Sequence, residues 1–137
     1  MDAPAEPGLT PYLRIGGDAG VRALVERFYD LMDLDPAYAG IRALHQPTLV
    51  VAREKLHQFL SGWLGGPQLY VERYGHPRLR ARHLPFAIAS SERDQWLACM
   101  RRSLADTGVP DDLATRLITA FFQTADFMRN VDDPPRA

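Results

Sequence analysis

Residues 74–86, YGHPRLRARHLPF, hold two of the four histidines of this 137-residue chain, with three arginines between them. An imidazole can donate or accept hydrogen bonds and can ligate a metal, and it changes charge near neutral pH. Guanidinium groups form paired hydrogen bonds with carboxylates. The first question that the sequence raises is therefore which of these two histidines performs chemistry, and on what group.

The prolines of this stretch predict where the histidines lie. Proline is tolerated in the first turn of a helix and tends to end one, which favours a short helix over residues 77–84. His76 would then stand outside the helix, whereas His83 would lie in its last turn on the same face as Leu79. An imidazole there can point one ring nitrogen inward while the other bonds a nearby carbonyl, as a histidine ligand of haem iron does.

Plainer interpretations of these side chains stay open at this point. A histidine on an apolar helix face is more often a core residue with satisfied hydrogen bonds than a metal ligand. Arg78, Arg80 and Arg82 are either a solvated face or, in part, partners of the haem propionates. A mononuclear metal hydrolase that uses all four histidines is a further alternative, but no H-E-x-x-H or comparable ligand pair supports it.

Four long segments carry apolar residues at helical spacing, and no segment alternates as a strand would. Asp18 and Thr48 are candidate caps of the first two segments, Ser90 and Ser91 precede the third, and Pro110 suits the first turn of the fourth. The sequence therefore predicts an all-α domain. The residues that share a face in each helix are, in order, Val25, Tyr29 and Met32; Leu56, Phe59 and Trp63; Trp96, Met100 and Leu104; and Leu113, Leu117 and Phe121.

Two intervals between these helices, residues 33–47 and 65–89, lack a long periodic run. The second is long for a connection in a compact domain, and such connections are usually functional or disordered. It contains Tyr70, Tyr74 and the histidine stretch, which is a poor composition for disorder. We therefore expect some further group to hold this interval in place.

Composition excludes several classes of protein. At 137 residues and 46% hydrophobic, the chain fits one domain with a substantial core. Sixteen basic and seventeen acidic residues leave a net charge of −1, so nothing points to nucleic acid or an anionic membrane as a partner. The single cysteine excludes an internal disulfide, and no secretion signal or membrane span is evident. These features predict a cytoplasmic protein.

The two ends of the chain are rich in proline and charge and show no periodicity. We expect residues 1–10 to be a disordered N-terminal extension and residues 131–137 to be a flexible tail. The folded domain would then span residues 11–130.

Five segments, taken in order, resemble the truncated haemoglobins of group II over about residues 11–130. They are YLRIGG before the first long helix, RFYDLM with Tyr29, FLSGWLGGP, GHPRLRARHLPF, and ERDQWLACM with Trp96. The resemblance implies a truncated globin fold, in which a two-over-two helical sandwich surrounds haem b. It also implies that His83 is the proximal ligand of the iron and that His76 is structural.

The resemblance assigns the distal side of the haem as well. Tyr29 and Trp96 would face the bound gas, and His45 would occupy a pocket position at the end of the short third helix. Ala52 stands where many globins have a distal histidine, and its methyl group can neither ligate iron nor bond a ligand. Hydrogen bonds to the ligand would then come from Tyr29, Trp96 and His45.

Each of these distal residues has a plainer interpretation. Without the resemblance, Tyr29 and Trp96 would be core aromatics whose polar atoms are satisfied elsewhere. His45, just before Pro47, could simply end the short helix. Phe28, Leu56, Phe59 and Phe86 are expected as pocket walls under either interpretation, because a core and a cofactor pocket look alike in sequence. Lys55, Tyr70 and Arg82 are the candidate partners of the propionates.

The function predicted from these residues is binding of dioxygen, carbon monoxide or nitric oxide at a five-coordinate haem iron. Several donors would hold a polar ligand tightly, which favours redox chemistry on nitric oxide or peroxide over carriage. Such chemistry requires an unidentified reductase, and a homodimer is a further expected partner. The alternatives are a cofactor-free helical interaction module and a haem gas sensor that acts through a separate protein, since one fold serves several roles.

Overall fold

The computed structural model describes residues 9–134, and within that range the chain forms helices and no strand. This confirms the predicted all-α class. The elements are α1 (Pro11–Arg14), α2 (Gly17–Leu34), the 3-10 helix η1 (Pro36–Tyr38), α3 (Ala39–Arg42), α4 (Val50–Trp63), α5 (Leu69–Tyr74), α6 (Leu79–His83), α7 (Ser90–Asp106) and α8 (Asp111–Phe127).

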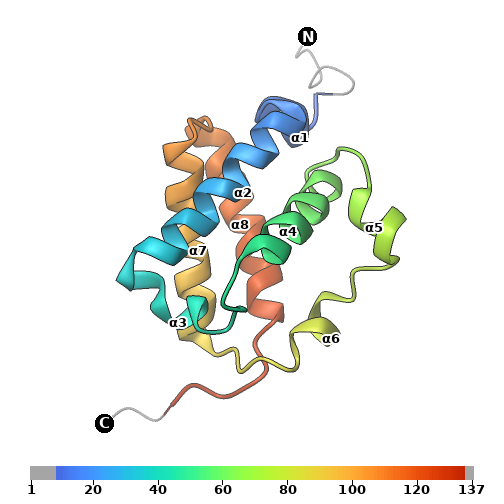
Figure 1. Ribbon diagram of the computed structural model, residues 1–137. Coiled ribbons are helices and arrows are strands. Elements are labelled where there is room, and N and C mark those ends of the chain that lie inside the picture. Colours follow the sequence, from blue (N-terminus) through green and yellow to red (C-terminus); the bar gives the residue numbers. More distant parts are fainter. Residues whose placement is uncertain (1–8, 135–137) are drawn as a thin grey trace.

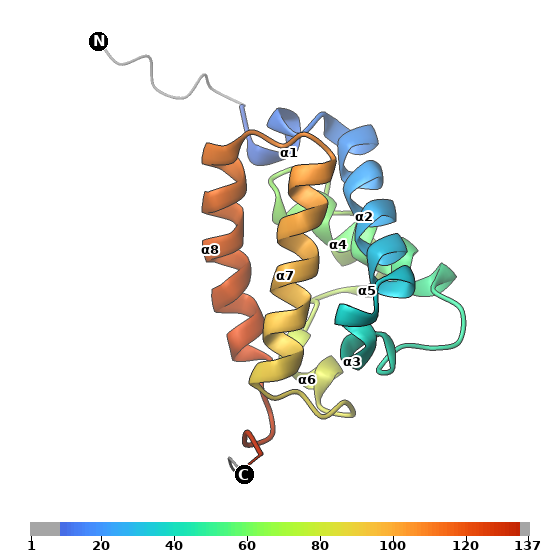
Figure 2. The same ribbon diagram turned by 90° about the vertical axis from the view of Figure 1, so that its left-hand side faces the viewer.

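The four long helices form two layers (Figure 1). Helices α2 and α4 lie side by side, and α2 packs across α7, which in turn runs beside α8 (Figure 2). The helix faces predicted from the spacing of apolar residues point into the space between these layers, since most of their residues are buried. The largest fully buried side chains include Phe28, Leu24, Met32, Leu60, Met100, Leu104 and Leu113. The architecture is therefore the predicted two-over-two helical sandwich.

The predicted caps of the first two long helices are wrong. The cap position of α2 is Gly16, whose φ of 108° lies in the left-handed region that glycine adopts without strain. Asp18 instead lies in the first turn, where its Oδ1 accepts a hydrogen bond from Nε2 of His57 at 2.7 Å. Helix α4 begins after Leu49, without a side-chain cap from Thr48.

The two intervals without a long periodic run contain only short helices. Residues 33–47 hold η1 and α3, and residues 65–89 hold α5 and α6. Helix α5 packs against α4, whereas α6 contributes no buried residue. Helix α6 begins at Leu79, two residues later than predicted, because Arg78 before it adopts a left-handed φ of 47°.

The predicted end segments are described only in part, since residues 1–8 and 135–137 lie outside the described residues. Inside that range, Thr10 caps α1 by accepting a hydrogen bond from the amide of Leu13. At the other end, the carboxylate of Asp133 accepts hydrogen bonds from the amide and hydroxyl of Ser90. None of the described helices is long and apolar enough to cross a membrane.

Candidate functional site

His83 is the last residue of α6, and its ring is held by the helix itself. The Nδ1 atom lies 2.6 Å from the carbonyl oxygen of Leu79, one turn earlier. Because a carbonyl can only accept, Nδ1 must carry the proton, which leaves a lone pair on Nε2. The side chain is half-buried, and Nε2 has no hydrogen-bond partner among the described residues. The bond from Nδ1 to a carbonyl is the one expected of a metal-binding imidazole, and the role of His83 as the iron ligand stays a prediction.

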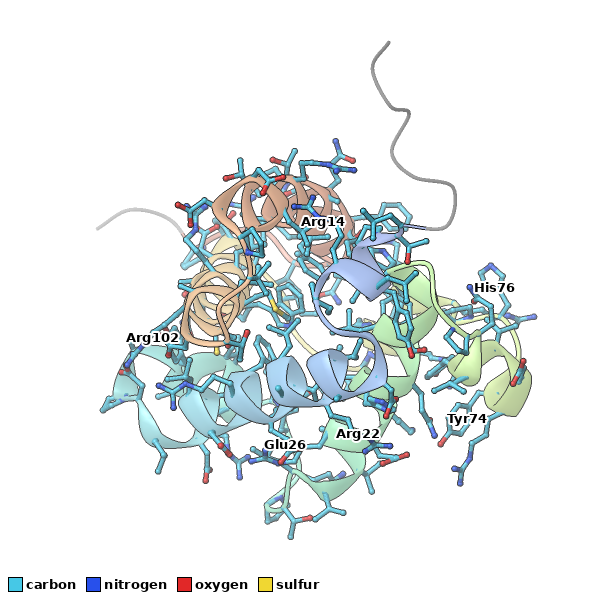
Figure 3. All side chains as sticks on the ribbon, turned by 90° about the horizontal axis from the view of Figure 1, so that it is seen from above. Arg14, Arg22, Glu26, Tyr74, His76 and Arg102 are labelled. Carbon is cyan, nitrogen blue, oxygen red and sulfur yellow. The ribbon has the colours of Figure 1, made fainter. Side chains whose placement is uncertain are left out.

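His76 occupies a different environment. Its Nδ1 accepts a hydrogen bond from the amide of Arg78 at 3.0 Å, and the side chain is exposed. Viewed from above, His76 and Tyr74 project from the outer edge of the molecule (Figure 3). His76 therefore bonds the turn before α6 and does not face the interior.

Tyr29 is the most deeply buried of the predicted distal residues, with 6% of its surface exposed. Burial raises the pKa of its phenol above the ordinary value, so the hydroxyl stays protonated and able to donate. No described residue forms a hydrogen bond with that hydroxyl. The ring packs against Phe28, at 5.0 Å between centroids, and against His45, at 5.8 Å.

His45 lies three residues beyond α3 and bonds back to it. Its Nδ1 lies 2.7 Å from the carbonyl oxygen of Ile41, so the ring does help to end that helix. Burial lowers the pKa of His45 most; the bond to Ile41 raises it in part, and the charge of Arg42 lowers it further. The ring is therefore neutral near pH 7, and its contact with Tyr29 leaves Nε2 without a hydrogen-bond partner in the described chain.

Trp96 projects from α7 into the same aromatic cluster. Its ring centroid lies 5.3 Å from that of Phe28 and 5.2 Å from that of Phe121. The indole is half-buried, and its N–H donates to no described residue. A buried tryptophan usually finds a partner for this donor, as does a buried tyrosine for its hydroxyl. Phe28 thus joins two aromatic side chains, Tyr29 and Trp96, whose polar atoms are both unused.

The predicted walls of the pocket are unevenly covered. Phe28 is fully buried, Leu56 and Phe59 on α4 are half-buried, and Phe86 after α6 is 40% exposed. Ala52 is half-buried on the same helix. Two surface hollows of about 210 and 220 Å³ are lined by other residues, the first by α2 and α4 and the second by α1, α8 and the end of α4. Only Phe28 among the predicted walls is fully buried, and the role of the four residues as walls of a haem pocket stays a prediction.

The three predicted propionate partners gather around a pair of tyrosines. Tyr70 is buried beside Tyr74, and the guanidinium of Arg82 lies 5.8 Å from the centre of the Tyr70 ring. The ammonium of Lys55 lies 5.5 Å from the centre of the Tyr74 ring. Neither Lys55 nor Arg82 forms an ion pair within the described chain, so both charges are available to an anionic group. Their contact with propionates stays a prediction.

Arg80 does not belong to this cluster. Its Nη1 donates to the carbonyl oxygens of Phe127, at 2.9 Å, and Arg129, at 2.7 Å. Asn130 likewise donates to the carbonyl of His83. Sequence reasoning missed both connections, because they join residues 47 to 49 positions apart and leave no local pattern.

The described residues fit a haem group better than a metal ion held by side chains alone. Within residues 9–134, no three histidine, cysteine or acidic side chains are grouped so as to hold a metal. Haem iron needs only one protein ligand, an apolar cavity wall and cations for its propionates. The free Nε2 of His83, the half-covered walls and the unpaired charges of Lys55 and Arg82 provide these three features.

Comparison with known proteins agrees with this site. Residues 10–130 match the family of bacterial-like globins. The group 2 truncated hemoglobin YjbI of Bacillus subtilis (strain 168) is 37% identical over 120 residues, which is 88% of each chain. A group II 2-on-2 hemoglobin from the plant pathogen Agrobacterium tumefaciens has a TM-score of 0.88 at 42% identity, over 95% of this chain and 100% of its own.

A second solved structure is almost as similar. The cold-adapted truncated hemoglobin from the Antarctic marine bacterium Pseudoalteromonas haloplanktis TAC125 has a TM-score of 0.86 at 43% identity, over 89% of this chain and 98% of its own. Both the sequence and the fold therefore match one family over nearly the whole described chain. The chain belongs to the bacterial-like globins and is a truncated haemoglobin of group II.

Proposed function

We propose that this truncated haemoglobin binds haem b through His83 and uses Tyr29, Trp96 and His45 to retain a diatomic ligand for redox chemistry. Membership of the family supports haem-based oxygen binding. The observation that carries the finer proposal is the pair of unused donors in the aromatic cluster, the hydroxyl of Tyr29 and the indole N–H of Trp96.

When bound, haem supplies an iron with one open coordination position for a small ligand. The protein would contribute a ligand for the iron and donors for the small molecule. His83 offers the Nε2 lone pair, because its Nδ1–H is already committed to Leu79. The neutral phenol and indole would stabilise a bound ligand by donating to it, and Ala52 contributes no polar atom.

His45 supports Tyr29 in this arrangement. The edge-to-face contact between their rings limits where the phenol can turn, and the bond from His45 to Ile41 fixes the imidazole. With its Nδ1–H bonded to Ile41, the neutral imidazole could only accept at Nε2, and no hydrogen bond joins Nε2 to the hydroxyl of Tyr29 in the described chain. Tyr29 then keeps its hydrogen for a ligand in the pocket.

Strong retention of oxygen suits reaction better than carriage. Conversion of nitric oxide and dioxygen to nitrate consumes one electron (NO + O₂ + e⁻ → NO₃⁻), and reduction of peroxide consumes two electrons and two protons (H₂O₂ + 2 e⁻ + 2 H⁺ → 2 H₂O). Either reaction requires an unidentified reductase, and we place the protein in the cytoplasm, where such reductants act. A second copy of the chain is a further proposed partner.

Absorption spectra of the purified protein test the proposal. Oxidised, dithionite-reduced and carbon monoxide-treated samples should each give a distinct haem spectrum, with the reduced form five-coordinate. Addition of nitric oxide to the oxygenated protein should then yield nitrate in step with oxidation of the haem. A colourless, fully folded protein would contradict haem binding, and a haem protein that yields no nitrate and consumes no peroxide would contradict the redox role.

A further inference from the structure

Helix α6 cannot hold its own position. It is five residues long and contributes no buried side chain. A helix this short is not stable in isolation, because nucleation costs more than its few hydrogen bonds return. The orientation of His83, its last residue, must therefore depend on contacts with other parts of the chain.

The end of α8 provides those contacts. The last carbonyls of a helix have no partner within the helix. Arg80 in α6 donates to two carbonyls at this end, those of Phe127 and Arg129, and its guanidinium lies 5.6 Å from the centre of the Phe127 ring. The chain that leaves α8 consequently runs next to α6 and the start of α7 (Figures 1 and 2).

Asn130 makes the second connection, and it reaches His83 directly. Its Nδ2 donates to the carbonyl oxygens of His83, at 3.1 Å, and Phe86, at 2.8 Å. Its Oδ1 accepts from the amide of Ile88 at 3.0 Å, and its own amide donates to the carbonyl of Ile88 at 2.9 Å. In the flipped orientation, the amide oxygen would face the carbonyls of His83 and Phe86, and the NH₂ group would face the amide of Ile88. Neither contact could form a hydrogen bond, so the orientation of the side chain is fixed.

His83 is therefore held at two points. Its ring is tied through Nδ1 to Leu79, and its main-chain carbonyl is tied through Asn130 to the end of α8. The first contact sets the rotation of the ring relative to α6, and the second sets α6 relative to the rest of the fold. Both are needed to aim Nε2 in a fixed direction.

We propose that Asn130 is a positioning residue for the proximal ligand, which holds residues 83–88 against the end of α8 so that Nε2 of His83 keeps its direction. This inference rests on the proposed role of His83 as the iron ligand. Asn130 touches neither the ligand pocket nor Nε2, so it acts only through the main chain of His83.

Two substitutions separate the contacts of Asn130. Asn130→Ala removes every side-chain bond, whereas Asn130→Asp keeps an oxygen for the amide of Ile88 but cannot donate to His83 or Phe86. Gln123→Ala is the matched control, because it removes an exposed amide side chain from α8 that forms no hydrogen bond in the described structure. Circular dichroism should first show that all three variants are folded.

Three measurements on these variants test the inference. The first is the iron–histidine stretching frequency of the reduced protein by resonance Raman, and the second is the rate of haem transfer to excess apomyoglobin. We expect both Asn130 variants to shift the frequency and to lose haem roughly tenfold faster than wild type, which corresponds to about 1.4 kcal/mol. Gln123→Ala should match wild type in both.

The third measurement needs no haem. Hydrogen exchange of the Ile88 amide in the apoprotein should be faster in Asn130→Ala than in Asn130→Asp, which keeps the acceptor. An unchanged frequency and haem-loss rate in both Asn130 variants would overturn the inference while leaving His83 as the ligand. Failure of the wild type to bind haem would overturn the proposed function and this inference together.

Discussion

The Nδ1 atom of His83 lies 2.6 Å from the carbonyl oxygen of Leu79, so the proton of this imidazole is committed to its own helix. That one contact fixes the tautomer and makes Nε2 the only nitrogen able to bind a metal. His76, seven residues earlier, accepts a hydrogen bond at Nδ1 from the amide of Arg78, at the exposed edge of the molecule. The two histidines of the same stretch therefore differ in what their rings can do.

Replacement of each histidine tests this difference. His83→Ala should lose most of its haem, or need added imidazole to retain it, because the substitution removes the Nε2 lone pair that is proposed to bind the iron. His76→Ala should keep its haem, since only the turn before α6 loses a bond. The measurement is haem content by pyridine haemochrome assay. Equal retention in both variants would refute the assignment.

Residues 65–89 should become more ordered when haem binds. Phe86 is 40% exposed and Leu79 half-buried in the structure, and haem would cover both while His83 becomes tied to the iron. A ligand that binds only the folded arrangement stabilises it. Hydrogen exchange should show these residues markedly more protected in the haem-bound protein than in the apoprotein, with the buried centre of α7 as an internal reference. Equal protection in both forms would contradict the prediction.

The bond between Asp18 and His57 should make stability depend on acidity. The hydrogen bond from His57 is the largest cause that lowers the pKa of the Asp18 carboxyl below its ordinary value of 3.8. The pKa of Asp18 is thus lower in the folded than in the unfolded protein. The contribution of the bond to the free energy of unfolding is therefore present above pH 3.8 and is lost as the pH falls through the pKa of the folded state.

Urea unfolding of wild type and Asp18→Asn provides the measurement. Wild type should be the more stable at neutral pH, and the difference between the two free energies of unfolding should shrink as the pH falls below about 3.8. Asp111→Asn is the control, because Asp111 lies in the first turn of α8 and forms no ion pair in the described chain. A difference that stays constant through this range would exclude the proposed linkage.

Much of the fold could be predicted from the spacing of apolar residues. In α2, Val25, Tyr29 and Met32 share one face, and all three are buried. The residues that helical spacing places on one face are therefore the residues that are buried in the core. The same pattern could not separate core from pocket, because Phe28 is fully buried whereas Leu56 and Phe59, on an equally regular stripe, are only half-buried.

What the sequence could not reveal depends on contacts between distant residues. Asp18 has the chemistry of a helix cap, but a histidine 39 residues away takes its carboxylate. Asn130 and Arg80 have no local signature at all, although together they hold the short helix that carries His83. Such contacts form only when the layers assemble, so the sequence does not predict them. The apolar spacing within one helix, by contrast, can be read from the sequence.

The proposed retention of oxygen depends on two distal donors. The hydroxyl of Tyr29 and the indole of Trp96 both lack partners in the described chain, and Phe28 packs against both rings. A net hydrogen bond contributes about 0.5–1.5 kcal/mol, and more when the acceptor carries charge, as oxygen bound to haem partly does. Since about 1.4 kcal/mol is a factor of ten, loss of one donor should speed oxygen release roughly tenfold or more.

Oxygen dissociation measured by stopped flow is the most direct test. Trp96→Phe and Tyr29→Phe should each release oxygen roughly tenfold faster or more, and carbon monoxide, which is less polar, should respond less. Trp63→Phe is the control, because it removes the other indole, which stacks on Phe121 and is not one of the predicted donors. Non-additive rates in the Tyr29 and Trp96 double mutant would indicate a shared network. Oxygen release that barely changes in these variants, or changes no more than carbon monoxide release, would show that the pocket is merely apolar.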